Sequence, residues 1–303
     1  MKQVRPLKLL RSYTTEFSKT GSLLLTLSRD VVVWDVGRRV KRYRVHPLSH
    51  PSHSSIHPNE EKIVIKNTAG QIALLAASDG MLIRLLEPAK GNEGSNILHS
   101  SCGEYVVDGS WNGQLTVRSA TSGKVAFQKE FPGEMIKRIV SSDDGGTWFV
   151  IHQPKAVSRE ASLESAYISI WSWPFTSPTE FVRATENGID ALAVSPDNRK
   201  ICIVGNSSVS VMELAEKRIV CSVPYNFGGT AFVAKWSPDS EEIATVQRHS
   251  FVFYDASTLE KRKSIELQYA SDIAYSPDSS QLALGAWESG MLIKREKSAL
   301  PID

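Results

Sequence analysis

The stretch ALAVSPDN at residues 191–198 decides the fold, because the same phrase occurs twice more in the chain. Its copies are VAKWSPDS at residues 233–240 and IAYSPDS at residues 273–279. In each copy a short apolar run leads into Ser, Pro, Asp and a small polar residue, a composition typical of a type I turn that closes a β-hairpin. A second apolar run follows each turn, so the phrase predicts a β-hairpin that is repeated along the chain.

Weaker versions of the phrase extend the repeat towards the N-terminus. They begin at Phe17, Ile56, His99 and Val140, which gives seven copies with the three above. From Phe17 to Tyr275, equivalent positions in successive copies are separated by 39, 43, 41, 54, 42 and 39 residues. A period of about 40 to 45 residues is typical of a four-stranded propeller blade, so the spacing predicts seven blades.

The strands of each unit can be followed in order. A third strand follows each hairpin, as at residues 31–36, and a fourth follows in the first six units, as at residues 39–45. The seventh unit lacks a fourth strand, whereas Gln3–Leu10 precedes the first unit unused. If Gln3–Leu10 supplies the missing fourth strand of the seventh unit, an exposed sheet edge is removed. We therefore expect an all-β chain in which residues 1–303 form a single seven-bladed β-propeller of four-stranded antiparallel blades, closed by the N-terminal strand.

One short motif carries a family resemblance. The dipeptide Trp34-Asp35 ends an apolar strand in the first unit, and Tyr254-Asp255 is a near match in the sixth. Together with the sevenfold repeat, these residues make the whole chain resemble a WD-repeat-like β-propeller. The resemblance implies a rigid ring that displays loops, usually as a platform for protein partners and without chemistry of its own.

The composition is that of an ordinary globular protein, with 41% hydrophobic and 22% charged residues. A formal net charge of +2 predicts no general attraction to nucleic acid, and no apolar run has the length that crosses a bilayer. The three cysteines, Cys102, Cys202 and Cys221, lack the spacing of paired or metal-binding thiols. These features predict a cytoplasmic protein that needs no cofactor.

Candidate partner-binding residues lie on the connections between second and third strands. By the family's geometry these connections share one face with the links between blades. The residues that open them include Arg29, Lys66, Trp111, Arg248 and Trp287. Because Trp and Arg are favoured interface anchors, they predict recognition of a peptide, and the alternative is that the tryptophans pack between blades.

The fourth unit is longer than the others because of an insertion between its second and third strands. The insertion runs from His152 to Ser165 and includes Arg159. Insertions in repeat proteins collect on one face, commonly the binding face, so His152 and Arg159 are further candidate partner contacts. An insertion without a binding role is the alternative.

A basic segment occupies the fourth strand of the first unit. It contains Arg38, Arg39, Lys41, Arg42 and Arg44. Cations on an outer strand protect a sheet edge from pairing with another chain. The alternative is a local docking patch for an acidic protein, an RNA backbone or a lipid headgroup.

Four histidines follow within twelve residues, at His46, His50, His53 and His57. Three prolines, Pro47, Pro51 and Pro58, disfavour a continuous helix that would align the imidazoles. A loop could gather two or three of them around Zn²⁺, whereas a solvated connection between blades one and two is the simpler interpretation.

Enzyme signatures are missing from the sequence. It contains no phosphate-binding glycine loop, no Gly-x-Ser-x-Gly and no His-Glu-x-x-His. We therefore expect a non-catalytic scaffold for a protein or peptide partner. Two alternatives stay open: a hydrolase- or lactonase-type propeller enzyme with its site at the central channel, and a nucleic-acid or phosphoinositide binder that uses the basic segment.

Overall fold

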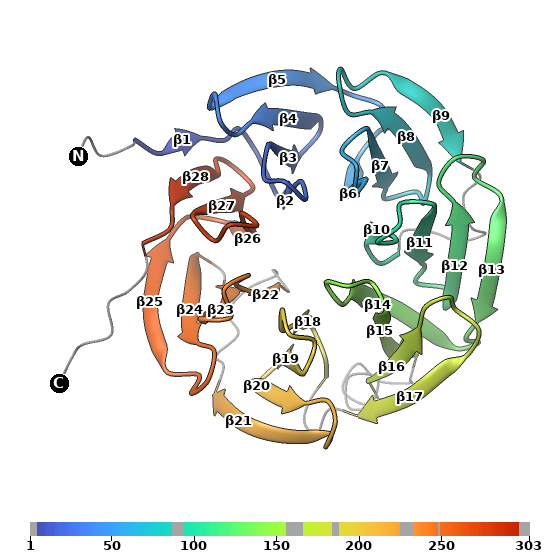
Figure 1. Cartoon of the computed structure of the whole chain (residues 1–303), viewed down its shortest axis with the longest axis vertical. Helices are drawn as coiled ribbons and strands as arrows, with labels where there is room; N and C mark the ends of the chain where they lie inside the picture. The colour runs from blue at the N-terminus through green and yellow to red at the C-terminus, as the bar shows by residue number, and fades with distance from the viewer. Residues whose placement is uncertain are drawn as a thin grey trace.

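The chain forms a ring of seven β-sheets in the computed structural model (Figure 1). The structure describes residues 5–86, 94–155, 166–183, 188–224, 233–247 and 249–296. Each sheet has four antiparallel strands, and the sheets follow one another in chain order around a common axis. The predicted all-β, seven-bladed propeller is confirmed.

The first three blades each use four consecutive strands, which run from the inner to the outer position. Blade one has β2 (Thr14–Phe17), β3 (Leu23–Leu27), β4 (Val31–Asp35) and β5 (Val40–Val45). Blade two has β6 (Pro51–Ile56), β7 (Lys62–Asn67), β8 (Ile72–Ala76) and β9 (Leu82–Leu86). Blade three has β10 (Ile97–His99), β11 (Tyr105–Gly109), β12 (Gln114–Ser119) and β13 (Val125–Glu130).

The next three blades follow the same order. Blade four has β14 (Glu134–Ser141), β15 (Thr147–Pro154), β16 (Tyr167–Ser172) and β17 (Pro178–Arg183). Blade five has β18 (Ala191–Val194), β19 (Lys200–Val204), β20 (Ser208–Glu213) and β21 (Arg218–Pro224). Blade six has β22 (Ala234–Trp236), β23 (Glu242–Gln247), β24 (Ser250–Asp255) and β25 (Lys261–Glu266).

Blade seven closes the ring with a strand from the other end of the sequence. Its own strands are β26 (Ala270–Tyr275), β27 (Gln281–Ala286) and β28 (Met291–Lys294), and β1 (Leu7–Lys8) is the outer one. Leu7 pairs with Leu292, and the guanidinium of Arg39 donates to the carbonyl oxygen of Arg5 at 2.9 Å. The predicted closure is confirmed with a shorter strand than expected, and residues 1–4 lie outside the described ranges.

The turn after each inner strand has one conformation throughout the ring. In Ser195–Lys200, the hydroxyl of Ser195 donates to Asp197 and accepts the N–H of Lys200, while Asn198 has a φ of 58°. A positive φ recurs at the same place in the other six turns, at Gly21, Glu60, Gly103, Gly145, Ser240 and Ser279. This type I turn followed by a left-handed residue is a common hairpin connection, and it matches the predicted repeat.

The hydrophobic core is divided into one cluster between each pair of neighbouring blades. Alternate residues of a strand point to opposite faces, so β3 contributes Leu25 to the cluster shared with blade two and Leu24 to the cluster shared with blade seven. Both side chains are fully buried, which stabilises the ring by roughly 1.5–3 kcal/mol each. Every blade is therefore held by its two neighbours.

Polar side chains join the inner strands, whose inner edges have no strand to pair with. Glu16 accepts the N–H of Ile56 at 2.8 Å, Asn96 accepts the N–H of Ile139 at 2.9 Å, and Ser55 accepts the N–H of His99 at 3.0 Å. Each bond runs from one blade to the next. Side chains of one blade thus satisfy part of the inner edge of the next.

Candidate functional site at the mouth of the channel

One end of the ring axis opens into a cavity of about 950 Å³, which we call the mouth of the central channel. In a four-stranded antiparallel blade, the start of the first strand lies at the same end as the connection between the second and third strands. The residues that line the mouth come from these two places in several blades. They include Tyr13, Arg29, Trp111, Arg138 and Trp287.

Two tryptophans are displayed at the mouth. Trp111 is 42% exposed and Trp287 is 58% exposed, so neither is buried between blades. The ring of Trp287 stacks on Tyr13, with 5.1 Å between the ring centroids and 25° between the planes. This stack spans the junction between blades seven and one, and it holds an exposed indole in a fixed orientation.

The charged groups at the mouth are mainly cations. Of the described residues that line it, Arg11, Arg29, Lys137 and Arg138 are cationic, whereas Asp190 is the single carboxylate. Lys137 donates to Asp190 at 2.7 Å, and Asp190 is itself buried. Three guanidinium groups therefore exceed the negative charge available, and the mouth is electrostatically suited to an anionic ligand.

Burial lowers the pKa of two basic groups that line the mouth, Arg138 and His53. It lowers the pKa of Arg138, while the negative charge of Asp272 acts in the opposite direction. It lowers the pKa of His53 to about 3, with smaller contributions in the same direction from Lys66 and Arg138. His53 is consequently neutral near pH 7, and Arg138 keeps its charge.

The channel wall also holds two carboxyl groups with raised pKa values. Burial raises the pKa of Glu16 to about 7 and raises that of Asp272, while the nearby ammonium of Lys235 lowers both. The oxygens of Glu16 accept hydrogen bonds from Ile56 and Ser54, and Asp272 accepts the N–H of Thr15 at 2.7 Å. These carboxyl groups serve first as ties between neighbouring blades.

Three of the sequence-predicted partner contacts meet at the mouth: Arg29, Trp111 and Trp287. Lys66 does not, because it is only 1% exposed and its ammonium binds Asp108 and two backbone carbonyls of blade three. His152 is also buried, because β15 continues through it to Pro154 instead of ending before the insertion. Arg159 and Arg248 lie outside the described residues.

His152 belongs to a polar chain inside blade four. Its ring nitrogens contact Glu134 at 3.0 Å and Ser169 at 2.6 Å, and the indole of Trp171 donates to the same Ser169 hydroxyl. Tyr167 stacks on the imidazole and donates to Glu134. The hydrogen bonds of His152 are thus internal to the blade, whereas the sequence predicts a loop position.

The basic segment is divided between structural contacts and solvent. Arg39 holds the closing strand, and Arg44 forms an ion pair with Asp30. Arg38, Lys41 and Arg42 have exposed side chains on or beside β5. The segment lies on an outer edge of the ring, as predicted, and it does not line the mouth.

The four histidines are spread along the axis because β6 forms where a loop was expected. His46 contacts the carbonyl oxygen of Arg29, and His50 and His53 line the mouth. His57 lies at the far end of β6, where it contacts the carbonyl oxygen of Gly103. Within the described part of the chain, no group of three or more His, Cys, Asp or Glu side chains converges as metal ligands would.

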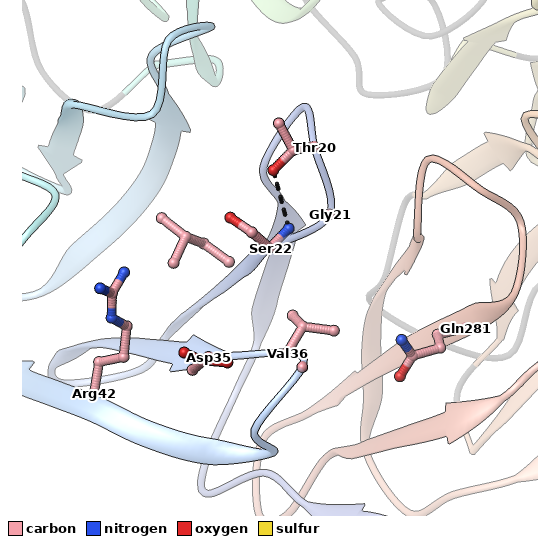
Figure 2. A pocket seen from close by; sticks show the side chains of 9 residues that line it. Thr20, Gly21, Ser22, Asp35, Val36, Arg42 and Gln281 are labelled. Atoms are coloured by element: carbon pink, nitrogen blue, oxygen red, sulfur yellow. Dashed lines mark hydrogen bonds between the residues drawn. The ribbon is translucent and has the colours of Figure 1, made fainter.

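A second hollow of about 490 Å³ lies by the turns between the first and second strands and between the third and fourth strands (Figure 2). Its lining includes Thr20, Asp35, Arg42 and Gln281. The N–H of Ser22 donates to the hydroxyl of Thr20, and Asp35 accepts the N–H of Arg38. Several polar groups of this hollow are thus used in hydrogen bonds within its own turns. Its described lining residues include no aromatic ring.

Sequence reasoning missed most residues of the mouth, among them the aromatic and charged residues Arg11, Tyr13, Lys137, Arg138 and Asp190. These named residues all lie just before or near the start of an inner strand. The signal was present in the topology, since those positions share an end with the connections that carry Arg29, Trp111 and Trp287.

Comparison with protein-family models and with curated protein sequences finds no match for this chain. Within the described ranges, no helix has the length and apolar character needed to span a membrane.

Proposed function

We propose that the protein is a non-catalytic interaction scaffold that binds a peptide segment of a protein partner at the mouth of the channel. The observation that carries this proposal is the convergence of Trp111, Trp287 and four cations on one cavity. Its volume of about 950 Å³ is at the upper end of the range of ligand pockets, roughly 300–1,000 Å³. Exposed Trp and Arg side chains on a rigid frame are typical of the residues that dominate binding energy.

Rigidity supports the same proposal. Tyr13 packs against the core cluster between blades one and two, and Trp287 stacks on Tyr13. Groups that are already ordered before binding lose less conformational entropy when a partner arrives. A peptide could therefore bind without rearrangement of the blades.

The proposal includes a WD-repeat-like propeller that works in the cytoplasm. The indole of Trp34, in the dipeptide that carries the resemblance, donates to the hydroxyl of Thr26 at 3.1 Å. This contact ties the third strand of blade one to its second, and it supports the resemblance by giving that Trp a structural role.

Catalysis at the central channel is the second candidate function. It is favoured by one observation, the pKa of about 7 for Glu16 in a channel that also contains Asp272 and Lys235. A carboxyl group that titrates near neutral pH suits general acid and base catalysis. The hydrogen bonds that tie Glu16 to blade two favour the structural role, and measured turnover abolished by Glu16→Gln would favour the enzyme.

The experiment that tests the scaffold proposal is selection from a displayed library of random peptides. Peptides selected on the wild-type protein are synthesised, and their dissociation constants are measured by calorimetry with Trp111→Ala, Trp287→Ala and Phe181→Ala. Phe181 is a matched control because it is 57% exposed on β17 and does not line the mouth.

Each tryptophan substitution should weaken binding about 10-fold or more, because an aromatic anchor is lost, while Phe181→Ala should change it less than about 2-fold. The proposal is wrong if no peptide is selected, or if the three substitutions have equal effects.

A further inference from the structure

The inner strands of blades two, four and seven share an irregularity at the mouth. Each has a β-bulge near its first residues: the register shifts between Pro51 and His53, between Ile136 and Arg138, and between Ala270 and Asp272. A bulge inserts an extra residue and redirects the side chain that follows it, and such features are enriched beside functional sites. The residue after the bulge is His53, Arg138 or Asp272.

These three residues influence one another across the channel, although they come from different blades. The charge of Arg138 lowers the pKa of His53, and the charge of Asp272 raises that of Arg138. His53 and Arg138 also line the same cavity. The bulges therefore direct one neutral imidazole and one guanidinium into the cavity that the two tryptophans also line.

Arg138 differs from its neighbours in having no close partner. Lys137, the residue before it, is bound to Asp190 and to the carbonyl oxygen of Ile189. Asp272 is occupied by the N–H of Thr15. The guanidinium of Arg138 makes no hydrogen bond and no ion pair with any residue in the described ranges, although burial already lowers its pKa.

A partly desolvated guanidinium without a partner is unfavourable, and a carboxylate corrects this with two parallel hydrogen bonds. We propose that the channel mouth holds a carboxylate subsite, in which Arg138 binds the side chain of a Glu or Asp residue of the partner peptide. This inference rests on the proposed function, since it names the chemistry of the segment that the mouth binds.

A carboxylate fits better than a phosphate at this depth. A dianionic phosphate is usually held by several cations or donors. Of the three described residues that follow the bulges, Arg138 is the single cation, and its neighbour His53 is neutral. One guanidinium matches one carboxylate in charge and in geometry. The indoles of Trp111 and Trp287, which line the same cavity, would then cover apolar side chains of the partner peptide.

The test uses a peptide selected on the wild-type protein from the random library. Each acidic residue in it is changed to its amide, and the dissociation constants of the peptides are measured with wild-type protein, Arg138→Gln, Arg138→Lys and Arg42→Gln. Arg42 provides the matched control, since its substitution removes one guanidinium from an outer strand away from the mouth.

One acidic residue should lose about 10-fold or more in affinity when it becomes an amide, and Arg138→Gln should lose a similar factor. The two changes together should cost little more than either alone, because they remove the same contact. Arg138→Lys should retain part of the affinity, and Arg42→Gln should keep all of it.

Several results would overturn the subsite. Binding that depends on Trp111 and Trp287 but not on Arg138 or on any acidic residue would refute it while leaving the proposed function intact. Tighter binding when phosphoserine replaces the acidic residue would assign the site to phosphate instead. Should Arg138→Gln fail to fold, the amide peptides measured against wild-type protein still decide the question.

Discussion

Asp272 accepts a hydrogen bond from the backbone N–H of Thr15 at 2.7 Å, and this bond joins blade seven to blade one at the inner edge of the ring. At the outer edge of blade seven Leu7 pairs with Leu292, and the chain runs on from this strand into blade one. The ring is therefore closed at two radii, one through a side chain and one through strand pairing.

Substitution of Asp272 by Ala should lower the free energy of unfolding by about 1–3 kcal/mol, because the buried N–H of Thr15 loses its acceptor. Asp272→Asn keeps an acceptor oxygen and removes a charge whose burial is unfavourable, so it should cost less. Urea denaturation of both variants measures the difference. Equal losses would show that the charge of Asp272, and not the hydrogen bond, stabilises the junction.

Glu16 should make stability depend on pH. Its pKa is raised from 4.5 to about 7 in the folded chain, so between these values the folded state binds more protons than the unfolded state. Under that condition the free energy of unfolding falls as pH rises, and the loss is complete above about pH 7. Asp272 acts in the same direction, because its pKa is also raised.

The variant Glu16→Gln cannot titrate at this position and should show a smaller fall in stability between pH 4.5 and 7. Denaturation curves at several pH values compare the two slopes. A slope unchanged by the substitution would mean that Glu16 has an ordinary pKa in the folded protein.

Lys66 and Asp108 form a buried ion pair between blades two and three, with 2.5 Å between the ammonium nitrogen and the carboxylate oxygen. Lys66→Met should destabilise the protein by about 3–5 kcal/mol, because it leaves the charge of Asp108 buried without compensation. The double variant Lys66→Met/Asp108→Asn removes both charges and should recover part of this loss. Thermal and chemical denaturation of the full cycle give the coupling energy, and simple additivity would argue against the pair.

Two glycines with positive φ allow the cost of backbone strain to be measured apart from the cost of steric overlap. Gly145 has a φ of 71°, and a Cβ there would overlap the hydroxyl of Ser101. Gly133 has a φ of 79° with nothing within 4 Å of its Cβ position. Gly133→Ala should cost about 1–2 kcal/mol from the backbone alone, and Gly145→Ala should cost more. Equal melting temperatures for the two variants would contradict this.

The repeat could be read from the sequence because the same turn chemistry recurs in every blade. Ser195, Asp197 and Asn198 each make a contact or adopt a conformation that depends on residue type, and the pattern returns at Ser237 and Ser276. The closing strand could be inferred because the last repeat lacks a fourth strand and an unassigned segment precedes the first repeat.

The site was only partly predictable, because burial of a polar residue depends on partners far away in sequence. Lys66 lies beside a strand connection, as Arg29 does, yet Asp108 from the next blade draws it into the interior. Arg138 was missed because a β-bulge, which leaves no clear signal in a single sequence, determines where its side chain points.

The closure between β1 and β28 has a consequence during synthesis. Leu9 and Leu24 belong to a cluster that Ala283 and Leu292 complete. In a nascent chain those two leucines lack their blade-seven packing partners until the last part of the sequence has been translated. The N-terminal part of this cluster therefore waits for its packing partners through almost the whole length of translation.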